Sequence, residues 1–309
     1  MRLPEHQPVL LEQVLEALAP PPCGLVVDAT VGLGGHAAAL LGRFPSVRVL
    51  GLDLDPEALA AAREKLARFG ERVSLVVASY WGLAEVARAH GVATADGVLF
   101  DLGVSSLQLD TPARGFSFRH DAPLDMRFGP GGETAGELLA AIGEEELVRV
   151  LRDFGEEPRA RRVARAIVRA RAKRTLRTTT DLRSVVASAL GPARGRIDPA
   201  TRTFQALRIA TNRELEGIPP ALEQAVRLLG PGGRLAVIAF HSLEDRLVKR
   251  TFRRLAGRCV CPPGSFACTC HPERLLEVLT PRPVTPTDVE VALNPRARSA
   301  KLRVARRAS

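Results

Sequence analysis

The residues best suited to chemistry begin with a glycine-rich turn. Gly32, Gly34 and Gly35 follow a short β-branched run, and Asp53 ends the next apolar run, 18 positions beyond Gly35. Glycines let the backbone turn tightly and approach a ligand, and an acid at the tip of the neighbouring strand accepts hydrogen bonds from a ribose diol. This pattern is typical of a nucleotide-cofactor site, although a strand, turn and helix without a ligand would show the same glycines.

Two further apolar runs are followed by residues that could serve the same ligand. Tyr80 and Trp81, the only tyrosine and tryptophan of the chain, follow residues 73–78, and Asp101 follows residues 97–100. Carboxyl ends of parallel strands meet at one edge of a sheet, where open α/β proteins bind their ligands. We expect one of the two aromatic rings to face an adenine, with packing in the core as the alternative.

Four of the five cysteines crowd into one short segment, with His271 directly after it: Cys259, Cys261, Cys268 and Cys270. In a cytoplasmic chain such a cluster indicates zinc binding or redox pairing more than a secreted disulfide framework. The C-x-C spacing is less diagnostic than C-x-x-C, because closely spaced thiolates chelate a tetrahedral metal with more strain. A zinc site and a metal-free loop therefore both stay open.

The net charge of +10 predicts a polyanionic partner, since neutralising phosphates is the commonest use of such an excess. Of the 44 basic residues only four are lysines, a bias that codon usage or adaptation to heat would also produce. The helix expected over residues 158–172 places Arg162, Arg165 and Arg169 on one face, opposite Val163 and Ile167. We expect this face to bind RNA, with an ordinary solvated helix face as the alternative.

Strand-like runs alternate with helical periods in the first third of the chain. This alternation predicts right-handed crossovers and a doubly wound parallel sheet. After Asp101 it stops for about a hundred residues. Helical periods there include two whose expected N-caps are Thr134 and Thr180. The alternating runs are residues 25–29, 47–52, 73–78 and 97–100.

The sheet is expected to resume after one helix over residues 202–229. Residues 234–240 predict a buried strand, and residues 300–307 predict a last, antiparallel strand at the sheet edge. The domain limits that follow are residues 1–110 and 201–309 for the two parts of one α/β domain, with an inserted helical, substrate-recognition subdomain at 111–200.

Several longer strings carry a resemblance that covers nearly the whole chain. They are residues 6–11 (HQPVLL), 34–36 (GGH), 101–106 (DLGVSS), 114–118 (RGFSF), 123–127 (PLDMR), 201–209 (TRTFQALRI), 240–246 (FHSLEDR) and 294–298 (NPRAR). In these strings the chain resembles the RsmH/MraW family of bacterial enzymes, which use S-adenosylmethionine to methylate N(4) of a cytidine in the decoding region of 16S rRNA. The resemblance implies a Rossmann-like class I methyltransferase sheet with an inserted all-helical subdomain.

The resemblance also implies roles for single residues. Gly34, Gly35 and His36 would contact the methionine end of the cofactor, and Asp53 its ribose. The remaining contacts would come from three residues: Tyr80 and Asp101 beside the adenine and methionine, and Gln108 closing the pocket.

Methyl transfer to a cytosine amine needs an acceptor for the surplus proton. Asp101, a loop carbonyl and Asp125 stay open as that acceptor. The base must leave any stack, and Phe116 and Phe118 are candidates to hold it. Neighbouring phosphates would be bound by Arg114, Arg119 and Arg127.

Other classes of protein stay in view. A nicotinamide oxidoreductase would use the same glycine turn, but the chain lacks a Tyr-x-x-x-Lys pair. A non-catalytic RNA-binding assembly factor with a retained cofactor pocket is the second alternative. No apolar run approaches the roughly 18 residues of a membrane span, so a cytoplasmic location is expected. The expected partner is 16S rRNA within the small ribosomal subunit, and the oligomeric state is left open, a homodimer included.

Overall fold

The computed structural model describes residues 8–19, 24–173, 176–191, 198–262, 264 and 267–308. The chain forms two compact units, one of Met1–Gly103 with Leu215–Ser309 and the other of Val104–Glu214. The domain limits expected at residues 110 and 200 both fall inside the second unit, and they stay a prediction. Within the described residues no helix is long and apolar enough to cross a membrane.

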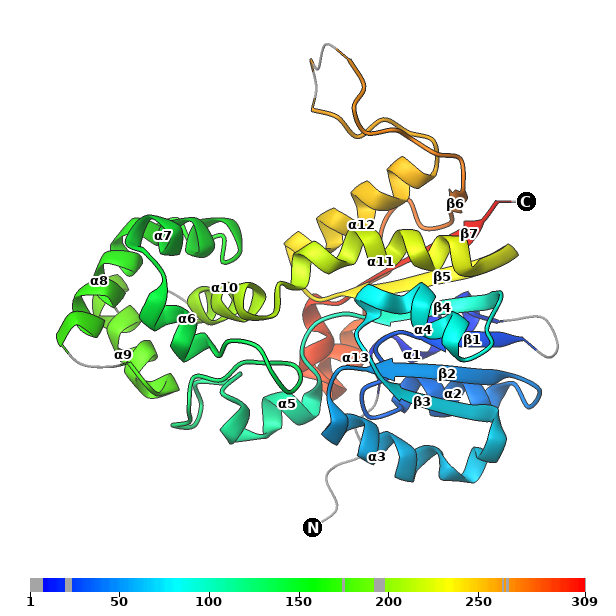
Figure 1. Ribbon diagram of the computed structural model, residues 1–309, viewed down its shortest axis with the longest axis horizontal. Helices are drawn as coiled ribbons and strands as arrows, with labels where there is room; N and C mark the ends of the chain where they lie inside the picture. The colour runs from blue at the N-terminus through cyan, green and yellow to red at the C-terminus, as the bar shows by residue number, and fades with distance from the viewer. Residues whose placement is uncertain are drawn as a thin grey trace. The chain divides into compact units, whose positions relative to one another are not determined.

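A seven-stranded sheet is the frame of the first unit, with the strand order β3-β2-β1-β4-β5-β7-β6 (Figure 1). The first five strands in the chain pair in parallel, while β7 is antiparallel to both of its neighbours. The strands are β1 (Leu25–Asp28), β2 (Arg48–Asp53), β3 (Val73–Val77), β4 (Ala95–Asp101), β5 (Leu229–Ala239), β6 (Leu276–Val278) and β7 (Lys301–Arg307).

The position of the C-terminal strand β7 in the sheet differs from the one expected from the sequence. Its antiparallel direction is confirmed, but the prediction that it forms the edge of the sheet is wrong, because β6 pairs with its outer side. β6 has only three residues, too few to show the alternation that marks a strand in a sequence.

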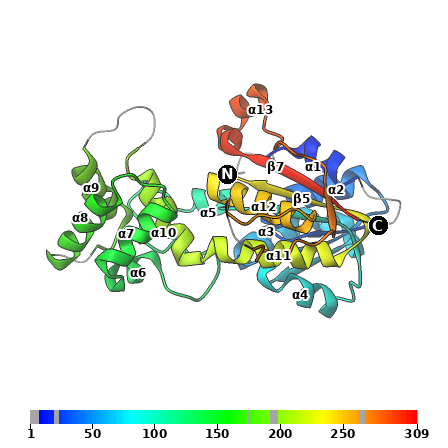
Figure 2. The same ribbon diagram turned by 90° about the horizontal axis from the view of Figure 1, so that it is seen from above.

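Helices cover both faces of this sheet (Figure 2). One apolar core joins the strands to α4 (Leu83–Ala89), α11 (Glu214–Leu228) and α12 (Ser242–Leu255). The other joins them to α1 (Leu11–Ala17), α2 (Gly35–Arg43) and α3 (Pro56–Leu66). Neighbouring strand residues such as Leu99 and Phe100 belong to opposite cores, since side chains alternate across a strand. A further helix, α13 (Asp288–Leu293), precedes β7.

The described residues of the second unit form helices around a core of their own. The helices are α5 (Ser106–Asp110), α6 (Ala135–Ala141), α7 (Glu144–Asp153), α8 (Ala160–Lys173), α9 (Thr179–Leu190) and α10 (Thr201–Asn212). Val163 and Ile167 of α8 are fully buried in that core, on the face that the sequence predicts. The arginine face of α8 is therefore turned away from it.

Two boundaries in the helical region differ from expectation. The N-cap of α6 is Thr134, as predicted, but α9 is capped by Thr178 and not by Thr180. The single helix expected over residues 202–229 is two helices, α10 and α11, because Arg213 adopts a left-handed backbone with φ 50°. No glycine or proline marks that break in the sequence.

Candidate cofactor and active site

The glycine turn after β1 is shaped by close packing. Gly34 has φ 74°, which favours glycine, and a Cβ there would lie 3.0 Å from Leu66 Cδ1. A Cβ on Gly35 would lie 2.6 Å from Pro8 Cγ. The two glycines thus let helix α2 begin a short turn after the end of β1, with its first backbone N–H groups at the carboxyl edge of the sheet.

Asp53 fastens this turn to the end of β2. Its Oδ2 accepts a hydrogen bond of 2.8 Å from the Gly32 N–H, and its Oδ1 accepts one of 2.9 Å from the Asp55 N–H. Each carboxylate oxygen keeps further acceptor capacity, because it has two lone pairs. Burial raises the pKa of Asp53, against the lowering effect of these backbone hydrogen bonds.

His36 lies buried at the start of α2. Its Nε2 is 3.0 Å from the carbonyl oxygen of Val9, and this nitrogen must donate because a carbonyl only accepts. Burial lowers the pKa of His36, which favours the neutral ring. The unprotonated Nδ1 then faces Asp101, whose Oδ2 lies 3.6 Å away.

Asp101 is the last residue of β4. Its Oδ1 is buried and has no hydrogen-bond partner among the residues that the structure describes, while its backbone N–H donates to Thr30 Oγ1 at 2.6 Å. Burial, with a smaller contribution from the charge of Glu244, raises the pKa of Asp101 to about 7. A buried oxygen without a donor costs free energy, so this position fits a ligand that brings a donor or a positive charge.

Asp28 and Glu244 are site residues that sequence reasoning missed. Asp28, the last residue of β1, is 1% exposed, and burial raises its pKa to about 7. Glu244 is also 1% exposed and caps α12 by accepting the N–H groups of Phe240 and His241. An acid within an otherwise apolar strand and a glutamate three residues after an N-cap were the available signals. Together with Asp101 these residues form an acidic cluster in a chain of net charge +10.

Tyr80 lies close to this edge of the sheet, in a short 3-10 turn (Tyr80–Gly82) after β3. Its half-buried ring packs edge-on against Phe100, with centroids 5.8 Å apart and planes at 77°. Trp81 instead packs closely against Gly217 of α11, where no Cβ would fit. Of the two aromatic residues, Tyr80 is therefore the better candidate for an adenine contact, and Trp81 has a packing role.

The remaining predicted residues belong to the second unit. Many of them lie in residues 108–128, where side chains hydrogen-bond to one another and to the backbone. Gln108 is 4% exposed, forms a capping box with Ser105 and donates from Nε2 to the Phe128 carbonyl at 3.3 Å. Arg114 donates to the same carbonyl at 3.0 Å. Asp125 accepts two hydrogen bonds from the guanidinium of Arg127, at 2.9 and 2.7 Å.

The two phenylalanines of the predicted base site have different surroundings. Phe116 is 9% exposed and stacks on Phe128 with centroids 5.7 Å apart. Phe118 is less buried and packs edge-on against Phe204, with Arg183 over its ring at 5.7 Å. Arg119, next in the chain, is exposed. Phe118 and Arg119 are thus more accessible to solvent than Phe116.

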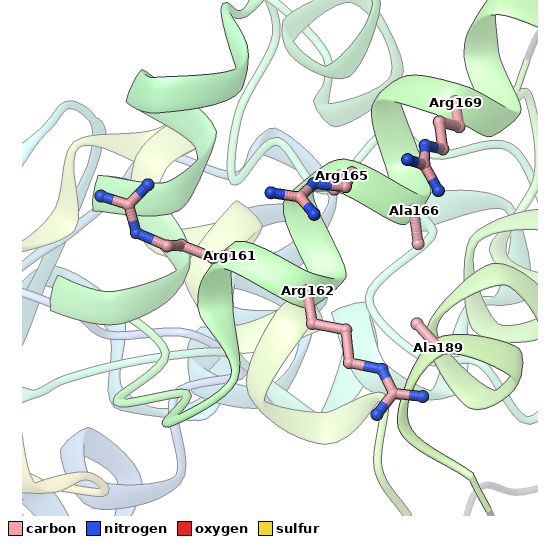
Figure 3. Close-up of a pocket in the computed structure, with 6 residues that line it drawn as sticks. All are labelled: Arg161, Arg162, Arg165, Ala166, Arg169 and Ala189. Atoms are coloured by element: carbon pink, nitrogen blue, oxygen red, sulfur yellow. The ribbon is translucent and has the colours of Figure 1, made fainter.

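A pocket of about 500 Å³ lies along α8. It is lined by Arg161, Arg162, Arg165, Ala166 and Arg169, with Ala189 contributed by α9 (Figure 3). Arg161 and Arg165 lie 3.4 and 3.9 Å from Glu145 and Glu144, whereas Arg162 and Arg169 form no ion pair with any residue that the structure describes. Guanidinium groups concentrated on one hollowed face are suited to binding phosphates.

The strand order, the antiparallel β7, the glycine turn and the acids at the strand ends define a class I methyltransferase. The family model described as the MraW methylase family matches residues 4–308, nearly the whole chain. The chain belongs to this family, and its methyl donor is S-adenosylmethionine. The fold class predicted from the sequence is confirmed.

Curated relatives agree with this assignment. A "Ribosomal RNA small subunit methyltransferase H" from Thermomicrobium roseum is 52% identical over 304 residues, which cover 98% of this chain and 93% of the relative. Proteins of the same name from Symbiobacterium thermophilum and Heliobacterium mobile are 52% and 49% identical. Those alignments cover 96% and 98% of this chain, and 95% and 98% of the respective relative.

Proposed function

We propose that this protein transfers a methyl group from S-adenosylmethionine to the N(4) amine of a cytidine in the decoding region of 16S rRNA. The main support is twofold: acidic residues lie at the ends of the strands, and the family model matches nearly the whole chain. The names of the relatives support small-subunit rRNA as the substrate class. We propose a cytoplasmic location and the small ribosomal subunit as the setting of the reaction.

The residues of the first unit fit the cofactor by their chemistry. The N–H groups at the start of α2, from Gly35 onward, would bind the methionine carboxylate, because the first N–H groups of a helix have no partner within the helix and carry a positive partial charge. The Gly34 N–H itself donates to the Val31 carbonyl at 2.8 Å, so Gly34 would contribute by shaping the turn. Asp53 would accept the ribose hydroxyls with its remaining lone pairs. Asp101 and its acidic neighbours would hold the positively charged methionine end, which supplies the donor that Asp101 Oδ1 lacks. Tyr80 would lie against the adenine.

The bound sulfonium supplies an activated methyl group, so that the carbon–nitrogen bond forms as the carbon–sulfur bond breaks. The protein must then position the amine and take up its surplus proton. We propose Asp101 for that proton. Burial raises the pKa of Asp101, so this carboxylate takes up a proton more readily than one held by a guanidinium. Asp125 is such a held acid, since hydrogen bonds from Arg127 lower its pKa.

The second unit would bind the RNA. Arg162 and Arg169 on α8 are the proposed phosphate ligands, together with Arg165 and the exposed Arg119. Phe118 is proposed to stack on the extruded base, with Phe116 supporting the loop from within the core. Arg114, Arg127 and Gln108 would hold this loop in shape and flank the substrate.

Transfer of tritium from methyl-labelled S-adenosylmethionine to small-subunit RNA tests the proposal against a non-catalytic assembly factor. We expect label in the RNA, and a strong loss of label with Asp101→Ala. Cofactor binding without any transfer, to naked 16S rRNA or to the assembled subunit, would favour the assembly factor. A parallel sedimentation experiment on the same sample distinguishes a monomer from a homodimer.

A further inference from the structure

The segment between α12 and β6 carries four cysteines that the reaction does not use. It leaves α12 after Leu255 and returns to the sheet at Leu276 (Figure 1). No described residue between 257 and 275 is buried, so the described residues of this segment form no apolar core. Backbone hydrogen bonds join its two ends, from Glu273 N–H to the Arg254 carbonyl at 3.0 Å and from Leu275 N–H to the Leu255 carbonyl at 2.8 Å.

The four sulfur atoms of this segment converge. Cys259, Cys268 and Cys270 form a triangle with Sγ···Sγ distances of 3.6, 3.5 and 3.7 Å, and all four Sγ atoms, that of Cys261 included, lie within 4.8 Å of one another. Four sulfurs placed about 2.3 Å from a tetrahedral zinc ion lie about 3.8 Å apart. The distances between the four sulfurs are therefore those of a zinc ligand set. Cysteines on a protein surface that bind no metal have no physical reason to converge in this way.

Backbone N–H groups also point at these sulfurs in a reciprocal way. Val260, the middle residue of the first C-x-C, donates to Cys270 Sγ at 3.3 Å. Thr269, the middle residue of the second C-x-C, donates to Cys261 Sγ at 3.3 Å. Donors directed at sulfur stabilise thiolates and orient metal ligands, so each C-x-C supports the ligands of the other.

We propose that Cys259, Cys261, Cys268 and Cys270 bind one Zn²⁺ ion tetrahedrally and that this ion is structural. Four thiolates complete the coordination of zinc and leave no open position for substrate or water. The ion would stabilise this segment, whose described residues bury no side chain, in the way that metals stabilise small structures with little buried surface. The proposal stands apart from methyl transfer, because none of the four cysteines belongs to the cofactor site.

Metal analysis of the reduced full-length protein tests this proposal. We expect about one zinc ion for each chain, and replacement by Co²⁺ should give the intense visible bands of a tetrahedral tetrathiolate. Cys259→Ser and Cys270→Ser should each abolish the cobalt spectrum. Two matched controls should keep it: Cys23→Ser, which alters the fifth cysteine, and His271→Ala, which alters the exposed histidine beside the cluster.

Removal of zinc from the wild type by a chelator gives a readout that needs no variant. We expect faster proteolytic cleavage between residues 257 and 275, with the cofactor affinity retained. The proposal is overturned if the reduced protein takes up no zinc or cobalt, or if mass analysis finds the four cysteines joined in two disulfides. Loss of the cobalt spectrum in His271→Ala would contradict the four-cysteine ligand set.

Discussion

At the scale of single residues, Asp53 has two tasks. It accepts N–H groups from Gly32 and Asp55, and it is the proposed acceptor for the cofactor ribose. Asp53→Ala should therefore weaken the binding of S-adenosylmethionine by about tenfold to a hundredfold, since a charged hydrogen-bond acceptor contributes about 1.5–3 kcal/mol. Isothermal calorimetry measures this change. An unchanged affinity would mean that the cofactor does not bind beside the end of β2.

The raised pKa of Asp101 predicts that cofactor binding depends on pH. In the free protein Asp101 is largely protonated below about pH 7, and a positively charged ligand favours its ionised form. Binding below that pH must release the proton, so the affinity should rise with pH, by up to about tenfold for each unit, and level off above about 7.

Calorimetry with S-adenosylmethionine at a series of pH values measures this dependence. Asp101→Asn should bind the cofactor more weakly and with a smaller pH dependence, the remainder coming from Asp28, whose pKa is also raised to about 7. Equal affinity of the wild type on both sides of pH 7 would rule out a protonated acid in the free pocket.

At the scale of elements, the exposed face of α8 predicts how RNA binding depends on salt. Each phosphate contact contributes about −0.7 to the slope of log affinity against log salt for a single strand. Arg162→Ala combined with Arg169→Ala should therefore reduce the magnitude of that slope by about 1.4 and weaken binding to all small-subunit RNA sequences alike. Filter binding across a salt series measures it.

Arg152→Ala is the matched control for that experiment. Arg152 lies on α7, outside the pocket, and its guanidinium already pairs with Asp153 at 2.7 Å. We expect this variant to bind RNA as the wild type does. A double variant of α8 with an unchanged salt slope would place the RNA on another surface.

The elements also explain what the sequence can and cannot predict. The alternation of apolar runs predicted β1 to β4, and the rule that ligands bind at strand ends pointed to His36, Asp53 and Asp101. The N-cap of α9 was ambiguous because three threonines occur in a row, and the reciprocal hydrogen bonds between Thr178 and Asp181 decide it. The left-handed backbone of Arg213 could not be predicted, since nothing in its residue type favours that conformation.

For the candidate site, the type and sequence position of a residue predict its role less well than its burial in the folded chain does. Asp28 lies inside the apolar run of residues 25–29, which hides it as a strand end, yet its complete burial raises its pKa to about 7, as for Asp101. The C-x-C pairs left zinc and a metal-free loop equally open, and only the convergence of the four sulfurs in space favours the metal. These properties depend on neighbours that are distant in the chain, which local patterns do not encode.

At the scale of the whole molecule, opposite charges belong to different units. Acids gather at the sheet edge of the first unit, where they suit a positively charged cofactor, and arginines gather on α8 of the second, where they suit phosphates. In a chain of net charge +10, the proposed site for the methyl donor is therefore acidic, while the excess of positive charge favours the proposed RNA partner. This separation is what we expect if the α/β unit binds the methyl donor and the helical unit binds the RNA, as proposed.

Nucleoside mass spectrometry of small-subunit RNA after incubation with the protein and S-adenosylmethionine tests the central claim most directly. The expected product is N(4)-methylcytidine at one position of the decoding region, formed by the wild type and not by Asp101→Ala. A methyl group on carbon 5 of the base or on a ribose, or methylation confined to another RNA, would contradict the proposed reaction.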